Sequence, residues 1–516
     1  MHEAAYRPAT LISVAWWAVP ATMAIAGASV LISFIGALTR GPWIDEFWTL
    51  FAVDHSLSLT AALEQRWWTD VHPPLFYFLS RLMSDVAGEN IAILRLQNSL
   101  AMLALIGFFL FANAVWRGSR RFLLVCAVLT FSSYFATGYF AELRSYYWQF
   151  VCGICFYCSG YFLLRREVSE SLLARRAAMI IFAVSTLLLV NLHFVTTLLT
   201  GISIAGLALV AVRSGHYRKA IFICVCGLLA LIPLILDLAF QGQYLIGRTG
   251  GQFWIASGFA DAAEIAVGSL AKGIGLSLFA ALLAAQTLGQ SLLVGTSGED
   301  AKDEVVIGAV FLALAIVPIG VLLVINIYTP VIVDRYLVLC SAAAICGMSV
   351  LVQDRAFSSP YGFALIVANA ALFLGIAGHK LIEEPRWNAS AALIAAKVAT
   401  CPTTVIEAFP FPYPGALPNE GAVFALGYGY LAERHGFQFV MAKPGAPLMR
   451  DESAKCPTVL WSEHIPPSLS AQGDAQVLLL NTVRRVLGPV DLDDPVVTWT
   501  KTGAIIVLRP DSKAKS

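Results

Sequence analysis

Long apolar runs, separated by short polar segments, dominate the chain. A membrane-crossing helix needs roughly 20 mostly apolar residues, and most of these runs reach or approach that length. They are Leu11–Leu38, Ile93–Trp116, Phe122–Gly138, Tyr146–Leu164, Ala177–Val212, Ala220–Phe240, Ala262–Gln290, Val305–Ile327, Leu337–Val352 and Tyr361–Gly378. The first run is too long, and too weakly basic at its start, for a cleaved signal peptide. We therefore expect it to remain as a membrane span.

The run Ala177–Val212 is too long for a single span. Basic residues flank it on both sides, namely Arg175, Arg176, Arg213, Arg218 and Lys219. Basic residues concentrate on the cytoplasmic side of membrane proteins, so both ends of the run are expected there. The run is therefore predicted to be a hairpin of two spans that turns near 191–193, which brings the predicted total to about eleven spans.

The basic clusters also predict an orientation. With the N-terminus inside, three clusters fall on the cytoplasmic face. They are Arg117, Arg120 and Arg121; Arg165, Arg166, Arg175 and Arg176; and Arg213, Arg218 and Lys219. The loop 291–304 is acidic and neither supports nor opposes this orientation. An odd number of spans then places everything after Gly378 outside, which in a bacterial inner membrane is the periplasm.

Composition agrees with a membrane protein. Of the 516 residues, 58% are hydrophobic and only 13% are charged, whereas a soluble protein of this size needs more charge on its surface. The net charge of +1 gives no reason to expect nucleic acid as a partner. Cys152, Cys155 and Cys158 have a spacing that a metal site can use, but small apolar residues on one helix face explain it more simply.

Three segments are expected outside the membrane. The segment 39–90 mixes Trp and Phe with charged residues, which is typical of helices that lie in the membrane interface. The segment 241–261 is rich in glycine and contains Arg248. The tail 379–516 alternates short strand-like runs with helix-like runs. The strand-like runs are Thr404–Glu407, Val423–Leu426, Phe437–Met441, Thr458–Trp461 and Ile505–Leu508, and the helix-like runs are Ala389–Val398 and Ala475–Val486.

This pattern predicts a mainly α-helical, polytopic membrane domain over 1–378 and a small external α/β domain over 379–516. Cys401 and Cys456 each precede a predicted strand of the tail. An oxidising compartment favours a disulfide between them, but the sequence leaves their geometry open.

Charged residues recur at the predicted outer ends of the spans. Asp45 and Glu46 follow the first span, and a carboxylate pair suits base catalysis or metal binding. The alternative for this pair is a solvated loop. His72 precedes two prolines, which favour the start of a helix. It is therefore either a ligand or proton carrier, or part of an ordinary turn.

Other polar residues lie at comparable depths. Most of them sit beside an aromatic residue or a second charge, so anchoring of a helix end and snorkelling are the structural alternatives. They are Arg95, Glu142, Arg144, Tyr146, His193, Lys272, Asp334, Arg335 and Tyr336. A phosphate group attracts Arg and Lys, while a hydroxyl acceptor needs a carboxylate base. Together these residues favour a function at the outer face.

The set of motifs resembles the polytopic GT-C glycosyltransferases. The resemblance is greatest to the bacterial branch related to dolichyl-phosphate-mannose protein mannosyltransferases and to the lipid A aminoarabinose transferase. The matching segments are Asp45-Glu46 for the acidic pair of the first external loop, His72-Pro73-Pro74-Leu75-Phe76-Tyr77 for HPPLYY, Arg95 to Leu100 for RLPSAL with Gln97 and Asn98 departing, Tyr139 to Tyr146 for YSQEARSY with Leu143 departing, Leu192-His193-Phe194 for THY and Arg335-Tyr336-Leu337 for RYL. The resemblance covers about residues 11–352, and the tail 379–516 is not diagnostic of the family.

The resemblance implies an inverting transfer of a monosaccharide from a polyprenyl-phosphate donor to a lipid, glycan or protein acceptor. It implies that Asp45 is the general base, supported by Glu46 and Glu142. It also implies a set of residues that bind the substrates, with the cations on the leaving phosphate: His72, Arg95, Arg144, Tyr146, His193, Arg248, Lys272, Arg335 and Tyr336. The resemblance implies no definite cofactor. Some relatives bind a divalent metal in this region, and His72 stands where one relative has a ligand.

Two alternatives belong to other classes of protein. A lipid or glycolipid transporter or flippase often contains internal repeats and helices broken at matching positions, and the sequence has no such repeat. An O-antigen-ligase-like enzyme would use a polyprenyl-diphosphate glycan, and the early Asp-Glu and His-Pro-Pro motifs argue against it.

The predicted orientation can be tested by reporter fusion. Because eleven spans follow an internal N-terminus, a reporter joined at Ser516 should be active only when it requires export, as alkaline phosphatase does. A cytoplasm-only reporter that fluoresces at this position would show that the number of spans is even.

Overall fold

The structure is a computed structural model. It describes residues 16–508 except 71, 166–170, 247–257, 275–298, 329–330, 358–359, 383, 385, 411–418, 444, 447, 450–454, 464, 466–473 and 489–494. The N-terminal part of the predicted first span and Arg248 therefore lie outside the described residues.

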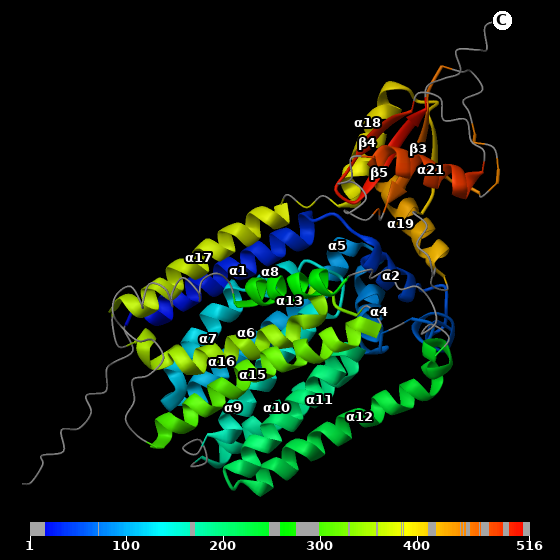
Figure 1. The fold of residues 1–516 in the computed structure, drawn as a ribbon. Coiled ribbons are helices and arrows are strands. Elements are labelled where there is room, and N and C mark those ends of the chain that lie inside the picture. The colour runs from blue at the N-terminus through cyan, green and yellow to red at the C-terminus, as the bar shows by residue number, and fades with distance from the viewer. Residues whose placement is uncertain are drawn as a thin grey trace, which may run out of the picture.

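The described chain forms a bundle of long helices with a smaller mixed domain at one end (Figure 1). Nine helical stretches in this part are long and apolar enough to cross a membrane. They contain α1 Ala18–Thr39, α6 Asn98–Val115 with the short α5 Ile91–Leu94 and η2 Arg95–Gln97 before it, α9 Tyr146–Leu164, α10 Leu172–Leu192, α11 Phe194–Arg213, α12 Tyr217–Ile246, α15 Glu299–Tyr328, α16 Val338–Ala356 and α17 Pro360–Ile382. The chain is a multi-pass membrane protein.

The predicted hairpin over 177–212 is confirmed. Helices α10 and α11 are separated by His193, whose backbone is extended (φ −167°, ψ 135°). The His193 ring then accepts a hydrogen bond from the backbone N–H of Val195 and so caps α11. The turn is therefore built by the same histidine that the sequence places at the predicted outer face.

The predicted span Phe122–Gly138 is not one continuous helix. Helix α7 covers Arg120–Ser132, the backbone of Ser133 is extended, and the short α8 covers Tyr134–Gly138. The Ser133 side chain accepts a hydrogen bond from the N–H of Phe135, so it starts a new helix where the first one stops. The 3₁₀ turn η3 Arg117–Ser119 precedes α7.

Ion pairs define the two ends of the bundle. Arg165, after α9, pairs with Glu304 at the start of α15, and the end that carries these two residues is called the Glu304 end. Asp45 and Arg335 pair at the other end, called the Asp45 end. Helix α13 (Phe259–Ile274) reaches the Asp45 end through an ion pair of Lys272 with Asp334. Only the first half of the predicted span Ala262–Gln290 is described.

The segment 39–90 folds over the Asp45 end. It contains α2 Ile44–Ala52, α3 Leu59–Ala62, the π-helical turn η1 Leu63–Trp67 and α4 Leu75–Ala87. The Trp67 indole donates a hydrogen bond to the carbonyl of Ala52, and Gln241 of α12 donates to the carbonyls of Trp67 and His72. Trp68 stacks on Phe240 at 4.5 Å between ring centroids. The segment is thereby fixed to α12.

The tail forms a five-stranded mixed sheet in the order β2-β1-β3-β5-β4. The strands are β1 Val405–Ala408, β2 Val440–Met441, β3 Thr458–Glu463, β4 Val496–Trp499 and β5 Gly503–Leu508, and the helices are α18 Trp387–Thr400, α19 Glu420–His435 and α21 Ala475–Leu487. Strand β1 is parallel to β2 and β3, while β5 is antiparallel to β3 and β4. A Cys401–Cys456 disulfide joins the end of α18 to the start of β3.

The sequence prediction for the tail needs two corrections. The run Val423–Leu426 is helical and lies within α19, because Val423, Phe424 and Tyr428 face one side of that helix and pack in the core. Strand β4 was not predicted, since its residues are only half-buried and their pattern is correspondingly weak.

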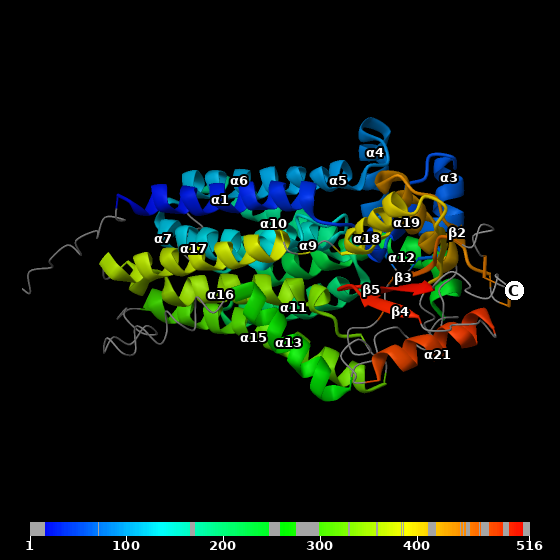
Figure 2. The same cartoon turned by 90° about the horizontal axis from the view of Figure 1, so that it is seen from above.

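The tail packs directly on the membrane domain. Phe47 of α2 contacts Trp387 of α18 (ring centroids 5.1 Å apart) and Tyr430 of α19 (5.8 Å). Gly427 of α19 lies so close that a Cβ atom there would be 2.7 Å from the Phe47 ring. Figure 2 shows the sheet and α18 at the same end of the bundle as α4. The tail therefore covers the Asp45 end.

Candidate active site

A buried ion pair fixes the position of the candidate site. The Glu46 carboxylate receives two hydrogen bonds from Arg95, from Nε to Oε1 and from Nη2 to Oε2, both 2.7 Å long. Its Oε1 atom also accepts from the backbone N–H of Leu143 at 2.8 Å. The Arg95 side chain is only 1% exposed and Glu46 is fully buried. This pair therefore joins α2 to η2 and to the turn before α9.

Arg95 also holds the end of α1. Its Nη1 atom donates to the carbonyls of Ala37 and Arg40, and its Nη2 atom donates to the carbonyl of Gly41. The last carbonyls of a helix lack partners within the helix, and a cation is favourable there. Burial alone would raise the pKa of Glu46, but the charge and hydrogen bonds of Arg95 lower it, so the carboxylate stays ionised.

Asp45, next to Glu46, faces two different arginines. One of its carboxylate oxygens lies 3.2 Å from Nη2 of Arg335 and 4.0 Å from Nε of Arg144. Asp45 belongs to the first turn of α2, Arg335 to η5 (Asp334–Leu337) and Arg144 to the turn between α8 and α9. The Arg335 guanidinium lies over the ring of Trp43 at 5.0 Å and near Tyr146 at 5.8 Å. Three segments distant in sequence thus converge on one carboxylate.

A second carboxylate lies on the other side of Arg144. Arg144 donates to the hydroxyl of Tyr77 at 3.3 Å, and that hydroxyl donates to Asp70. The same oxygen of Asp70 lies 3.0 Å from Nδ1 of His72. Burial alone would raise the pKa of Asp70, but the charge of His72 and its hydrogen bond lower it, with further contributions from Arg144 and Tyr77. Asp70 is therefore ionised and orients His72.

Contacts between histidine and tyrosine rings connect His72 back to the residue next to Arg335. The ring centroid of His72 is 4.9 Å from that of His193, and His193 is 4.6 Å from Tyr336. Tyr336 follows Arg335, which leads back to Asp45. The eight side chains are called the polar ring below. They are Asp45, Arg144, Tyr77, Asp70, His72, His193, Tyr336 and Arg335.

The two histidines of the polar ring each have a nitrogen atom without a partner among the described residues. The Nε2 atoms of His72 and of His193 are buried and have no hydrogen bond within that part of the chain. Each of these histidines uses its Nδ1 atom, toward Asp70 in one case and toward the N–H of Val195 in the other. A buried polar atom without a partner is costly, so both nitrogens are suited to bind a polar ligand.

Glu142 belongs to a different group of charges. It accepts hydrogen bonds from Arg40 at 2.9 Å and from Arg386 at 2.8 Å. Both arginines also pair with Glu384, which lies between α17 and α18. Burial alone would raise the pKa of Glu384, but Arg40 and Arg386 lower it to about 2. This cluster connects the end of α1, the turn before α9 and the start of the tail.

The structure thus sorts the residues singled out in the sequence. Asp45, His72, Arg144, His193, Arg335 and Tyr336 gather in the polar ring, and Tyr146 lies beside it. Glu46 and Arg95 pair with each other, and Glu142 pairs with Arg40 and Arg386. Lys272 pairs with Asp334 at 2.6 Å and so holds η5 next to the ring.

Sequence reasoning missed several members of this site. Asp70 stands two residues before His72, and this spacing was the available signal. Tyr77 was noticed only as part of a motif. Arg40 lies 344 residues before Glu384, which stands close to Arg386 in the sequence, and nothing in the local sequence indicates that Arg40 meets them.

Among the residues that the structure describes, no three metal-type ligands converge at the Asp45 end. Within the described residues, the group of three converging metal-type ligands is Cys126, Cys158 and Cys346, which lie in the helical core. Their sulfur atoms are 3.7 to 3.9 Å apart and come from α7, α9 and α16. Burying three thiolates without a counter-charge would be costly, so packing as small apolar residues explains them.

The fold has counterparts among solved structures. The chain superimposes on the crystal structure of ArnT from Cupriavidus metallidurans in the apo state, with a TM-score of 0.50 and 13% sequence identity over 95% of this chain and 98% of that one. A second crystal structure, of the same protein bound to undecaprenyl phosphate, gives a TM-score of 0.46 with 13% identity over 94% and 97% of the two chains. No protein-family model and no curated protein matches the chain. The chain therefore has an ArnT-like GT-C fold, as its motifs predicted.

Replacing Glu46 by Gln should lower the stability of the protein and not only its activity. The substitution leaves the Arg95 charge buried without its counter-charge, which typically costs about 3–5 kcal/mol. The free energy of unfolding of the purified protein, measured by SDS titration in mixed micelles, should fall accordingly. The control is Arg121→Gln, which breaks the partly exposed pair with Asp354 and should cost at most about 1 kcal/mol. A Glu46→Gln protein that is as stable as the parent yet inactive would instead place Glu46 in the chemistry.

Proposed function

We propose that this protein is a membrane glycosyltransferase that transfers a monosaccharide from a polyprenyl-phosphate donor to a lipid, glycan or protein acceptor, with inversion and with Asp45 as the general base. The observation that carries the proposal is the arrangement of the Asp45 carboxylate between Arg335 and Arg144. It combines a base with two phosphate-binding groups at the end of a membrane-spanning bundle. The ArnT-like fold supports the same class of reaction.

The charges of the polar ring suggest how the donor is recognised. The two arginines of the polar ring both face a carboxylate of the protein itself, that of Asp45. A phosphate that enters must therefore take guanidinium groups from Asp45. Arginine suits this exchange because its planar fork can bind a carboxylate or a phosphate with paired hydrogen bonds. The donor phosphate and Asp45 thus compete for Arg335 and Arg144.

This competition also activates the base. A carboxylate that faces opposite charges is stabilised in its ionised form and attracts protons less strongly. Once the phosphate occupies Arg335 and Arg144, Asp45 loses that stabilisation and becomes a stronger base. It can then remove the proton of the acceptor hydroxyl while the oxygen attacks the anomeric carbon. The bond from that carbon to the phosphate oxygen breaks, and polyprenyl phosphate leaves. The two arginines neutralise the negative charge of the leaving phosphate.

The remaining members of the ring are suited to positioning. The His72 ring lies beside the His193 ring, which lies beside Tyr336. The buried Nε2 atoms of both histidines can bind sugar hydroxyls or a phosphate oxygen. Asp70 fixes His72 through its Nδ1 atom. Holding both substrates in place and neutralising the leaving phosphate then supply most of the rate enhancement. The predicted periplasmic orientation fits a donor that is already activated and carried in the membrane.

The first test concerns the base. Asp45→Asn keeps the shape of the side chain and removes its basicity, so turnover should fall about 10²- to 10⁴-fold. The measurement is release of free polyprenyl phosphate from a panel of polyprenyl-phosphate monosaccharides by the protein reconstituted in vesicles, followed by mass spectrometry. Asp54→Asn is the matched control, since Asp54 lies in the same segment and pairs with the partly exposed Arg66. Near-parental turnover of Asp45→Asn would exclude Asp45 as the base.

The second test concerns the competition for the arginines. Arg335→Ala and Arg144→Ala should each weaken binding of polyprenyl phosphate roughly 30-fold or more, as expected for removal of one partner of a buried charged contact. Lys at either position should rescue only part of this loss. Asp45→Asn should bind polyprenyl phosphate as tightly as the parent or more tightly, because it no longer competes for the arginines.

Binding is measured by isothermal titration in detergent, with Arg66→Ala as the control from the same segment. Weaker binding by Asp45→Asn, or unchanged binding by both Arg→Ala variants, would contradict the exchange of partners. Movement of intact donor across the vesicle membrane, without release of polyprenyl phosphate, would instead indicate a transporter.

A further inference from the structure

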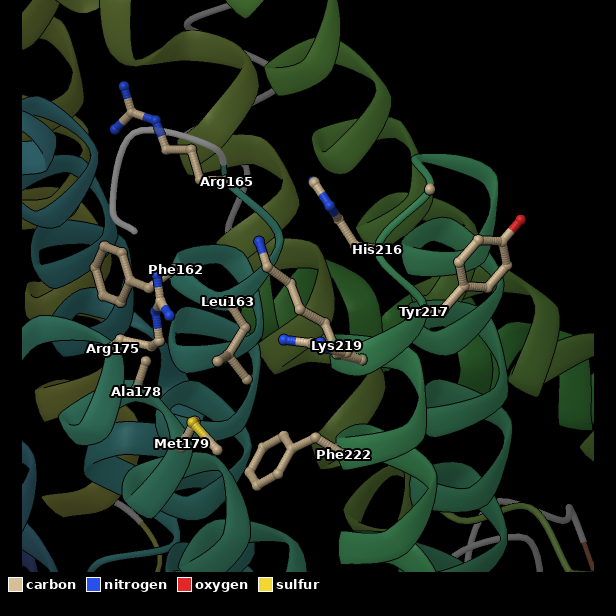
Figure 3. A pocket seen from close by; sticks show the side chains of 12 residues that line it. Phe162, Leu163, Arg165, Arg175, Ala178, Met179, His216, Tyr217, Lys219 and Phe222 are labelled. Atoms are coloured by element: carbon tan, nitrogen blue, oxygen red, sulfur yellow. The ribbon is translucent and has the colours of Figure 1, made fainter. Parts of the chain in front are cut away.

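A basic cavity of about 590 Å³ lies at the Glu304 end of the bundle, far from the polar ring. It is formed by the end of α9, the start of α10 and the turn between α11 and α12 (Figure 3). Helix α9 alone has 19 residues and is thus about 28 Å long. This distance separates the cavity from Tyr146, which lies beside the polar ring. The cavity is therefore a separate site.

The turn between α11 and α12 brings cations to this cavity. Gly215 has a left-handed backbone (φ 75°), and the N–H of His216 donates a hydrogen bond of 2.7 Å to the carbonyl of Ala211. The next helix starts immediately, so Arg218 and Lys219 line the cavity from its first turn. Arg175 lines it from α10, and Figure 3 shows the side chains of Arg175 and Lys219 directed into the same space.

The charged side chains among the described lining residues are basic. Arg165, Arg175, Arg218 and Lys219 contribute, and the described residues that line the cavity include no Asp or Glu. Arg165 is held at the edge by Glu304 at 3.0 Å and by Ser119 at 2.6 Å. Arg175 and Lys219 lie close enough together to repel each other. An anion between them would remove this repulsion.

The other wall of the cavity is apolar and continues onto the surface of the bundle. Leu163, Met179 and Phe222 line it. Next to two of them along the helices, Ile180 of α10 is 64% exposed and Ile221 of α12 is 63% exposed. Exposed aliphatic residues on a membrane-spanning helix face lipid chains. The cavity therefore joins a cationic recess to a lipid-facing surface.

We propose that this cavity binds the headgroup of an anionic glycerophospholipid, with the phosphate between Arg175 and Lys219 and an acyl chain along Met179, Phe222 and the exposed faces of α10 and α12. Basic pockets between membrane helices are known to bind anionic headgroups in this way. The apolar wall selects a lipid over a soluble phosphate ion, because the ion would leave that wall uncovered. In the orientation that the basic clusters predict, the site lies in the cytoplasmic leaflet. The proposal is independent of the transferase activity.

The test compares lipids on the full-length protein purified in a mild detergent. Native mass spectrometry should detect one retained dioleoyl phosphatidylglycerol that dioleoyl phosphatidylcholine at equal concentration does not replace. Each charge removed should weaken binding about fivefold, so Arg175→Gln with Lys219→Gln should bind phosphatidylglycerol about 25-fold more weakly. Arg175→Lys keeps the charge and should bind within about twofold of the parent. Arg213→Gln is the matched control, since Arg213 ends α11 at the same end of the bundle but does not line the cavity.

Three results would overturn the proposal. They are equal retention of both lipids by the parent, parental affinity of the double variant for phosphatidylglycerol, and thermal stabilisation by inorganic phosphate that equals stabilisation by the lipid. If the double variant does not fold, the single variants Arg175→Gln and Lys219→Gln give the same decision through their fivefold effects. Normal folding of each variant is checked by its elution volume and its unfolding temperature.

Discussion

The arrangement of the Asp45 end depends on the buried pair of Glu46 and Arg95. Arg95 binds the last carbonyls of α1 and the Glu46 carboxylate, and Glu46 binds the backbone of the turn before α9. The pair thereby sets the distance between α2 and that turn, which means the distance between Asp45 and Arg144. Charges buried in this way are stable only when every partner is present. The geometry of the polar ring is therefore built on a contact that takes no part in it.

One turn of α2 serves three environments. Successive residues of a helix point about 100° apart, so Asp45, Glu46 and Phe47 face different directions. Asp45 faces the arginines of the polar ring, Glu46 faces Arg95, and Phe47 faces Trp387 and Tyr430 of the tail. Displacement of the tail would thus act on the helix that carries Asp45. A second connection between the tail and the same region is ionic. It is the cluster of Arg40, Glu142, Glu384 and Arg386.

The sequence predicted what depends on short-range pattern. Apolar run length and flanking charges predicted the helices and the hairpin at His193, and conspicuous polar residues predicted most of the polar ring. The acidic pair shows what local sequence cannot predict. Because Asp45 and Glu46 are adjacent, a joint role was expected, but the partner of each carboxylate lies elsewhere in the chain. Arg386 meets Glu142 across 244 residues, and no local spacing encodes such a contact. The run Val423–Leu426 suits a strand or a helix, and packing of α19 against Phe47 decides for the helix.

The two ends of the bundle handle cations differently, and this difference has a physical consequence. At the Asp45 end, Arg335 and Arg144 face a carboxylate of the protein itself, so an incoming phosphate has to displace that carboxylate. Part of its binding energy is spent on the exchange, and the product can be released when the carboxylate returns. At the Glu304 end, Arg165 also pairs with a carboxylate, that of Glu304, but Arg175 and Lys219 approach each other from α10 and α12 and their charges repel. A phosphate between them is attracted by two cations at once, and the apolar wall beside it favours a bound lipid. Exchange of partners thus suits a site that must turn over, and a basic recess that continues into a lipid-facing wall suits one that holds a lipid.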